Sequence, residues 1–242
     1  LGLDAVYVAL RTPAAALPTV LSALASVGAA GNVTVPHKEA AERCVTRKTD
    51  ACARAGACNT FWVEDGHLVG DNTDVAGVEG ALDALGAGSA VRWLVLGTGG
   101  AARAVAVAAA HRDAQLGVRS RSPERGREFV AWAARALDVH VDAVHGPGDW
   151  DVAINATPLG LADGDPVPLA RGELGKGTRV LDLVYRSGET RWVREARAAG
   201  HAASDGREML IHQGAAAFER FFPGTAAPID VMRAAVARAL RA

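Results

Sequence analysis

The sequence predicts an α/β protein of two domains, each built on a β-sheet with helices packed against it. Short apolar runs alternate with longer amphipathic segments, which is the pattern of a mostly parallel sheet with helical connections. A glycine-rich loop, GTGGAA at 97–102, follows one of these runs and precedes an Ala/Val-rich segment. The stretch GAGS at 86–89 is typical of a linker. We therefore expect one domain at 1–90, completed by C-terminal helices at 206–242, and a second domain at 91–205.

Composition narrows the class of protein. The chain has 242 residues, half of them hydrophobic, which is enough for two packed cores. A net charge of −1 gives no reason to expect a nucleic acid or an anionic membrane as a partner. No apolar run reaches transmembrane length, and the opening LGLDAVYVAL lacks the pattern of a signal peptide.

Cysteine and histidine usage gives no metal signal. Cys44, Cys52 and Cys58 lack the spacing of zinc ligands, and the seven His residues are scattered. Three unpaired cysteines are typical of reduced thiols, so we expect a cytoplasmic protein without a metal site that acts on a small molecule.

Apolar patterning places the elements of the first half. We expect strands at 3–9, 30–34, 57–63 and 67–70, the last two joined by a hairpin turn at Glu64-Asp65-Gly66. A helix should follow Asp74, because apolar residues then recur at helical spacing at positions 75, 78, 82 and 85.

The second half continues the alternation. A buried strand is expected at 93–96, with further strands at 115–118, 140–144, 152–155 and 179–184. Helices are expected at 124–137, 189–199, 208–221 and 228–240.

The loop at 97–102 matches the dinucleotide-binding fingerprint of a Rossmann domain. Gly97 permits a tight turn, Gly99 lets a pyrophosphate approach the backbone, and Ala102 allows close packing of helix on strand. The N-terminus of the following helix offers free N–H groups and a partial positive charge to phosphates. A glycine-rich turn without a ligand is the alternative, but the order strand, loop, helix favours a cofactor.

The residues after the next strand favour NADP over NAD. An acidic residue there would bind the ribose 2′-hydroxyl of NAD. The sequence instead reads VRSRS at 118–122, so Arg119, Ser120 and Arg121 offer guanidinium and hydroxyl donors to a 2′-phosphate.

Lys38 stands out in the stretch NVTVPHK at 32–38. Of 26 basic residues only three are Lys, namely Lys38, Lys48 and Lys176. Lys can release and regain a proton in a protein and Arg cannot, so Lys38 indicates acid–base chemistry. A solvated surface Lys is the alternative for an isolated residue.

Polar residues downstream support the chemical interpretation of Lys38. GACNT at 56–60 and GDNTD at 70–74 lie at expected strand ends and at a helix start, where open α/β sheets build their sites. Asp74 could instead cap its helix, and Asn59 could stabilise a turn. Amide, hydroxyl and carboxylate groups beside a Lys suit a polyhydroxylated substrate and a proton donor for a ketone reduction.

Seven motifs of the chain, taken together, resemble those of the shikimate dehydrogenase family. The similar motifs are NVTVPHK, GACNT, GDNTD, GTGGAA, NATPLG at 155–160, DLVYRSGET at 182–190 and DGREMLIHQ at 205–213. The resemblance implies reversible reduction of 3-dehydroshikimate to shikimate with NADPH, in chorismate and aromatic amino-acid biosynthesis. It implies an N-terminal substrate-binding and catalytic domain and a Rossmann NADP-binding domain, in a monomer or homodimer.

The resemblance also implies roles for individual residues. Lys38 and Asp74 would form the catalytic pair. The substrate would be bound by Thr34, Asn59, Asp74, Tyr185 and Gln213. The cofactor would be held by Gly97, Gly99, Gly100, Ala101, Arg119, Ser120, Asn155, Thr157, Leu183 and Gly206, joined by Arg121 on the charge argument above. A Ser-x-Ser segment that binds the substrate carboxylate would be expected before Leu1.

Two other functions remain open from the sequence. A quinate/shikimate or aminoshikimate dehydrogenase would use the same cleft, although quinate users often prefer NAD, which the two Arg residues disfavour. A non-catalytic sensor of NADP or of a metabolite would share the fold. Lys38 and Asp74 together favour catalysis, because a sensor needs no proton donor.

Overall fold

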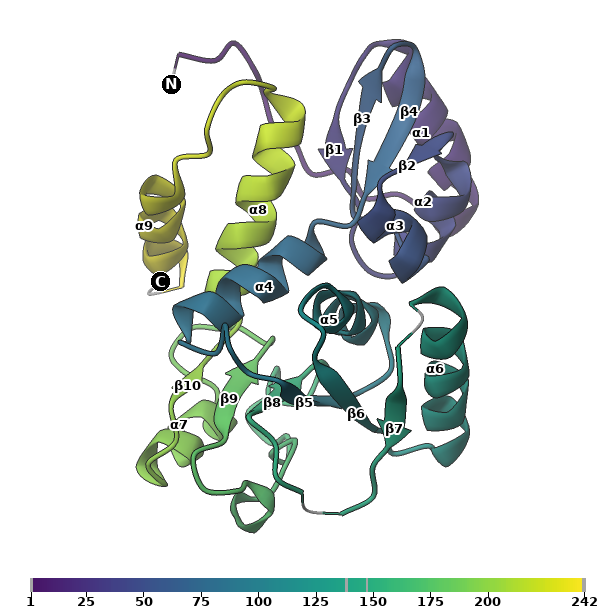
Figure 1. Cartoon of the computed structure of the whole chain (residues 1–242). Helices are drawn as coiled ribbons and strands as arrows, with labels where there is room; N and C mark the ends of the chain where they lie inside the picture. Colours follow the sequence, from purple (N-terminus) through teal and green to yellow (C-terminus); the bar gives the residue numbers. More distant parts are fainter. Residues whose placement is uncertain (1, 138, 147, 241–242) are drawn as a thin grey trace.

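The chain folds around two separate β-sheets. The computed structural model describes residues 2–137, 139–146 and 148–240. One sheet has four strands and the other six, and the helices α4 and α5 lie between them, with α8 beside the smaller sheet (Figure 1). The expected α/β class with two domains is confirmed.

The smaller sheet has the strand order β1-β3-β4-β2. These strands are β1 (Gly31–Asn32), β3 (Thr60–Glu64), β4 (His67–Asp71) and β2 (Arg47–Lys48). The predicted hairpin joins β3 to β4, with Glu64 opposite His67 and positive φ at both turn residues, 51° at Asp65 and 74° at Gly66. Two positive φ angles match the twist of a two-residue hairpin, which explains the Asp-Gly pair.

Short helices cover one side of this sheet. They are η1 (Ala14–Ala16), α1 (Leu17–Ser26), α2 (Lys38–Cys44) and α3 (Asp50–Ala55). Leu17 and Leu21 of α1 pack with Ala41 of α2 and Cys52 of α3 into a core that includes Phe61 of β3. The helices are too short to be stable alone, so this shared core holds them in place.

The predicted strand at 3–9 is wrong. Residues 3–9 have no strand assignment, and Val6, Tyr7 and Val8 are 91%, 74% and 66% exposed. The alternating apolar pattern was present, but a strand also needs a neighbouring strand to share its hydrogen bonds. Among the described residues, a side-chain bond from the Tyr7 hydroxyl to Asn32 Oδ1, 3.0 Å long, ties this segment to β1.

The larger sheet is doubly wound. Its order is β10-β9-β8-β5-β6-β7, and all its neighbours are parallel. This order is that of a Rossmann domain, with the chain reversing its direction of winding beside β5. The strands are β5 (Arg92–Leu96), β6 (Gln115–Arg119), β7 (Val141–Ala143), β8 (Val152–Asn155), β9 (Arg179–Asp182) and β10 (Ala203–Ser204).

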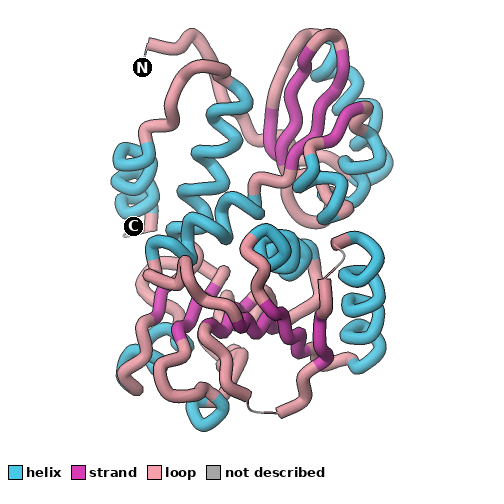
Figure 2. Tube along the Cα trace, viewed as in Figure 1, coloured by secondary structure: helices cyan, strands magenta, loops and turns pink. Residues whose placement is uncertain are grey.

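Helices cover both faces of the larger sheet, as Figure 2 shows. Helices α5 (Gly100–His111) and α6 (Pro123–Ala136) pack on one face. Helix α7 (Arg191–Ala198) packs on the other, with a segment that contains the short η2 (Arg171–Glu173) close by. Strand β5 serves both faces because its side chains alternate: Trp93 and Val95 point to α5, while Leu94 and Leu96 point to α7.

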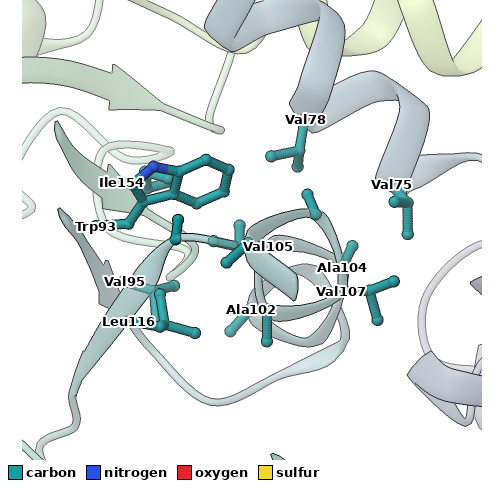
Figure 3. Packing of buried hydrophobic residues seen from close by; sticks show 14 of the residues in the cluster. Val75, Val78, Trp93, Val95, Ala102, Ala104, Val105, Val107, Leu116 and Ile154 are labelled. Carbon is teal, nitrogen blue, oxygen red and sulfur yellow. The ribbon is translucent and has the colours of Figure 1, made fainter. Parts of the chain in front are cut away.

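Helix α4 (Asp74–Ala84) joins the two halves. Its Val75 and Val78 enter the same core as Trp93, Val105 and Ile154 of the larger domain (Figure 3). Helix α8 (Arg207–Phe221) packs closely against α4, and Gly77 has no room for a side chain: a Cβ there would lie 2.8 Å from the Met209 carbonyl oxygen. Helix α9 (Ile229–Ala239) follows and packs on α8.

We propose that the domain boundaries lie near residues 90 and 205. The four-stranded sheet ends at Asp71 and the six-stranded sheet spans 92–204. Helices α8 and α9 return to α4 after the last strand, which supports the assignment of 206–242 to the first domain.

The contact between α4 and α8 generates a stability prediction. Replacement Gly77→Ala should lower the free energy of unfolding by about 1–3 kcal/mol, because the new methyl group meets the backbone of α8. Gly214→Ala on α8 is the matched control, since its Cβ would have no atom within 4 Å, and helix propensity should raise stability by up to about 1 kcal/mol. Chemical denaturation measures both, and equal effects would show that the contact imposes no constraint.

Candidate active site

Lys38 and Asp74 meet at the start of two helices. Lys38 is the first residue of α2 and Asp74 the first of α4. Lys38 Nζ lies 2.5 Å from Asp74 Oδ2, and the side chains are 22% and 8% exposed. The alternative in which Asp74 caps its helix does not hold, because Thr73 occupies the cap position. The carboxylate in the first turn still suits the positive end of the helix dipole.

Asn59 holds the carboxylate of Asp74 from the other side. Its Nδ2 donates to Asp74 Oδ1 at 2.8 Å. Its Oδ1 accepts from the backbone N–H of Thr73 at 2.8 Å and from the hydroxyls of Thr60 and Thr73 at 3.0 and 3.2 Å. Asn59 is 3% exposed, so it is a buried connector between β3 and the start of α4 rather than a simple turn residue.

Backbone bonds fix the three segments that carry these side chains. The N–H of Cys58 donates to the carbonyl of Lys38 at 2.9 Å, and the N–H of Val33 donates to the carbonyl of Asn59 at 2.7 Å. Thr34 follows Val33 and is exposed at the same edge, with its carbonyl accepting from His37 N–H at 2.9 Å. The side chain of Lys38 therefore extends from a backbone that is held in place by hydrogen bonds.

Asp71 is a buried anchor beside this cluster that the sequence reasoning gave no role of its own. It accepts from the Thr49 hydroxyl at 2.5 Å, from Asn72 N–H at 2.7 Å and from Arg220 Nε at 3.1 Å. Arg220 also stacks over Trp62, with 5.4 Å from its guanidinium carbon to the ring centroid. Helix α8 is thereby tied to the four-stranded sheet next to the GDNTD turn.

The glycine loop has the geometry that the fingerprint predicts. Gly97 has φ of 107°, and a Cβ there would lie 3.0 Å from the carbonyl oxygen of Ala156. A Cβ on Gly99 or Gly100 would have no atom within 4 Å, so this side of the loop is open. Helix α5 begins at Gly100, and Ala101 lies in its first turn. Free N–H groups and a helix N-terminus thus border open space.

The NATPLG loop lies beside the glycine loop. Asn155 is fully buried and donates from Nδ2 to Leu159 O and Asp182 Oδ1, at 3.0 and 2.8 Å. Its Oδ1 accepts from the N–H and the hydroxyl of Thr157, at 3.0 and 2.6 Å. All four hydrogen-bonding positions of the amide are used inside the protein, so Asn155 shapes the loop.

Asp182 anchors the loop that follows β9. It accepts from Asn155 Nδ2, from the Thr190 hydroxyl at 2.7 Å and from Val184 N–H at 3.1 Å. Burial raises the pKa of its carboxyl above the usual value, although the bonds from Thr190 and Asn155 oppose this rise.

Four further residues of the predicted site lie just after β9 and β10 or on α8. Leu183 donates its N–H to Asn155 O at 3.0 Å, and a Cβ on Gly206 would lie 2.3 Å from Leu183 O, so only Gly fits there. Gln213 of α8 donates to Leu210 O at 3.0 Å, and Tyr185 is 41% exposed.

The residues predicted to bind a 2′-phosphate begin at Arg119, the last residue of β6. Arg119 NH1 lies 2.5 Å from Glu173 Oε1, and its NH2 donates to Gly146 O at 2.5 Å. Ser120 Oγ accepts from Ser122 N–H at 3.3 Å, and Arg121 is exposed. The sequence reasoning missed Glu173, which is 54 residues away in the chain and carries no local signal.

Arg103 connects the two halves near Lys38. It lies in the first turns of α5, donates to Ala55 O at 3.5 Å and forms an ion pair of 3.7 Å with Glu39, the neighbour of Lys38. The start of α2 therefore lies close to the start of α5. A pocket of about 200 Å³ opens here between the glycine loop and α6, lined by Thr98, Gly99, Arg103, Arg125, Glu128, Phe129 and Trp132.

The described residues contain neither a metal-binding cluster nor a membrane-spanning helix. No group of three or more His, Cys, Asp or Glu side chains within 2–137, 139–146 and 148–240 is placed to hold a metal ion. None of the helices in these ranges combines the length and apolar character needed to cross a membrane.

Two family models match the chain. The model of the shikimate dehydrogenase substrate binding domain matches residues 1–61. The model of the shikimate 5′-dehydrogenase C-terminal domain matches residues 206–237.

Individual relatives extend over almost the whole chain. The shikimate dehydrogenase (NADP⁺) of Acidiphilium cryptum is 37% identical over 98% of this chain and 86% of its own length. The structure of shikimate 5-dehydrogenase from Thermus thermophilus with NADP(H) and shikimate is 35% identical, with a TM-score of 0.85 over 94% of this chain and 85% of that one. A quinate dehydrogenase of Corynebacterium glutamicum with NAD is 29% identical, with a TM-score of 0.83 over 92% and 82%.

The position of Asn59 generates a second prediction. Asn59→Ala should lower the free energy of unfolding by about 1–3 kcal/mol, because Asp74 and the N–H of Thr73 lose buried partners. Gln115→Ala at the start of β6 is the control; Gln115 is an exposed amide far from this cluster in the chain, so its loss should stay below about 1 kcal/mol. Thermal denaturation compares the two, and equal losses would mean that Asn59 is no special connector.

Proposed function

Since the chain belongs to the shikimate dehydrogenase family, we propose that it reduces 3-dehydroshikimate to shikimate with NADPH, reversibly, in chorismate and aromatic amino-acid biosynthesis. The observation that carries the proposal is the half-buried pair of Lys38 and Asp74. This pair lies at the start of α2, and the ion pair of the next residue, Glu39, with Arg103 brings that start close to the start of the glycine-loop helix.

Lys38 acts as the general acid of the reduction. A reduced nicotinamide, when bound, would supply a hydride to the ketone carbon, and negative charge would develop on the ketone oxygen. The ammonium of Lys38 donates a hydrogen bond to that oxygen and then a proton. In the oxidation of shikimate, neutral Lys38 accepts the proton from the hydroxyl.

Asp74 and Asn59 orient the amine and the substrate. Asp74 Oδ2 fixes Lys38 Nζ while Asn59 Nδ2 fixes Asp74 Oδ1, so the amine has a defined direction. Thr34, Gln213 and Tyr185 supply further hydroxyl and amide groups for the ring hydroxyls.

The C-terminal edge of the larger sheet would hold the cofactor. Gly97, Gly99, Gly100 and Ala101 offer backbone N–H groups to the pyrophosphate, and the open side of Gly99 and Gly100 supports this role. Asn155 and Thr157 shape the neighbouring loop, while Leu183 and Gly206 form the wall beside the nicotinamide. Arg119, Ser120 and Arg121 receive the 2′-phosphate.

Quinate is a second candidate substrate. It is favoured by the similarity to a quinate dehydrogenase, and the carboxylate on Arg119 would reduce the advantage of NADP over NAD. A panel of shikimate and quinate with each cofactor separates the two functions.

The test is oxidation of shikimate by NADP, followed by the absorbance of the reduced cofactor. We expect turnover by the parent protein and a loss of about 10²–10⁴-fold in Lys38→Arg, which keeps the charge but does not give up its proton. Lys48→Ala should keep full turnover, because Lys48 pairs with Glu42 away from this cluster.

Two results would count against this proposal. Parental turnover in Lys38→Arg would remove the proton-donor role. No turnover with either polyol, in folded protein that binds NADP, would favour a sensor.

A further inference from the structure

The guanidinium group of Arg119 is already hydrogen-bonded to other groups of the protein. Its NH1 meets Glu173 Oε1 and its NH2 meets the Gly146 carbonyl, both at 2.5 Å. Its Nε is buried and has no partner among the described residues. Two of the five guanidinium N–H groups are therefore committed inside the protein, and the side chain is only 20% exposed.

Glu173 is held in place to make this contact. Its second oxygen, Oε2, accepts from the backbone N–H of Ala170 at 3.2 Å, which closes the turn of η2. Burial opposes its ionisation, but the bonds from Arg119 and Ala170 lower the pKa of its carboxyl below the usual value. Glu173 is thus a fixed carboxylate at neutral pH.

The neighbouring Arg121 differs from Arg119. It is exposed and forms no ion pair with any described residue. Of these two guanidinium groups at the end of β6, one is neutralised and the other has no ion-pair partner in the part of the chain that the structure describes. The acidic residue that is absent after β6 in the sequence is supplied here from η2.

We propose that Glu173 is a specificity-determining residue that competes with the 2′-phosphate of NADP for Arg119 and so narrows the preference for NADP over NAD. The proposal rests on the proposed NADP site. If Glu173 releases Arg119 when NADP binds, the lost ion pair weakens binding. If Glu173 stays, its charge repels the phosphate. In both cases Glu173 weakens the binding of NADP. The binding of NAD is unchanged, because NAD lacks the 2′-phosphate.

The test is direct titration of NADP and of NAD by protein fluorescence, without substrate. Glu173→Gln keeps the size of the side chain and an acceptor for Ala170 but removes the charge. We expect it to bind NADP about five- to tenfold more tightly, with NAD changed by less than about twofold. Glu124→Gln, an equal change of charge in the first turn of α6, controls for long-range electrostatics and should change either affinity by less than about twofold.

A double-mutant cycle with Arg119→Ala assigns the effect to the pair. Arg119→Ala should weaken NADP by about tenfold or more and NAD far less, and adding Glu173→Gln to it should then change nothing. The inference is overturned by an equal gain for both cofactors, by weaker NADP binding in Glu173→Gln, by a gain that persists without Arg119, or by no binding of either cofactor. Turnover plays no part in this readout, so failure of the proposed reaction is seen separately.

Discussion

The ion pair between Lys38 and Asp74 is the interaction on which the rest of the site depends. An ammonium and a carboxylate with side chains 22% and 8% exposed must be paired, because an unpaired charge at that depth is costly. The pair is asymmetric: Asp74 is enclosed and bonded on both oxygens, whereas Lys38 keeps more of its side chain open. The exposed part of the Lys38 side chain is the part that a substrate can reach. The buried carboxylate of Asp74 fixes the direction of the amine.

Close helix and loop packing holds this pair against the larger domain. Asp74 begins α4, and α4 is locked to α8 at Gly77 and enters the same core as Trp93 of β5. Arg220 of α8 returns to Asp71, three residues before Asp74. The same helix carries Gln213 and begins beside Gly206, which packs on the Leu183 carbonyl. These contacts therefore fix the position of the Lys38–Asp74 pair relative to the end of β9.

Much of this arrangement could be predicted from the sequence because its signals are local. The Asp65-Gly66 turn, the strand before Gly97 and the long amphipathic helices α4, α6, α8 and α9 each carry a pattern of their own. Other elements are too short to show a hydrophobic period, so tertiary contacts define them. They are the two-residue strands β1, β2 and β10 and the short helices α2 and α3. The prediction of a strand at 3–9 was wrong because the segment's own sequence does not show whether a neighbouring strand will pair with it. The pairing of Lys38 with Asp74 was anticipated, but Glu173 on Arg119 was not, because only folding brings η2 to the end of β6.

A crystal structure of the protein with NADP and shikimate bound would test whether Lys38 transfers the proton. We expect Lys38 Nζ to contact both Asp74 and the hydroxyl that is oxidised, with the nicotinamide on the opposite side of that carbon. A complex in which another group contacts this hydroxyl while Lys38 remains remote would contradict this expectation.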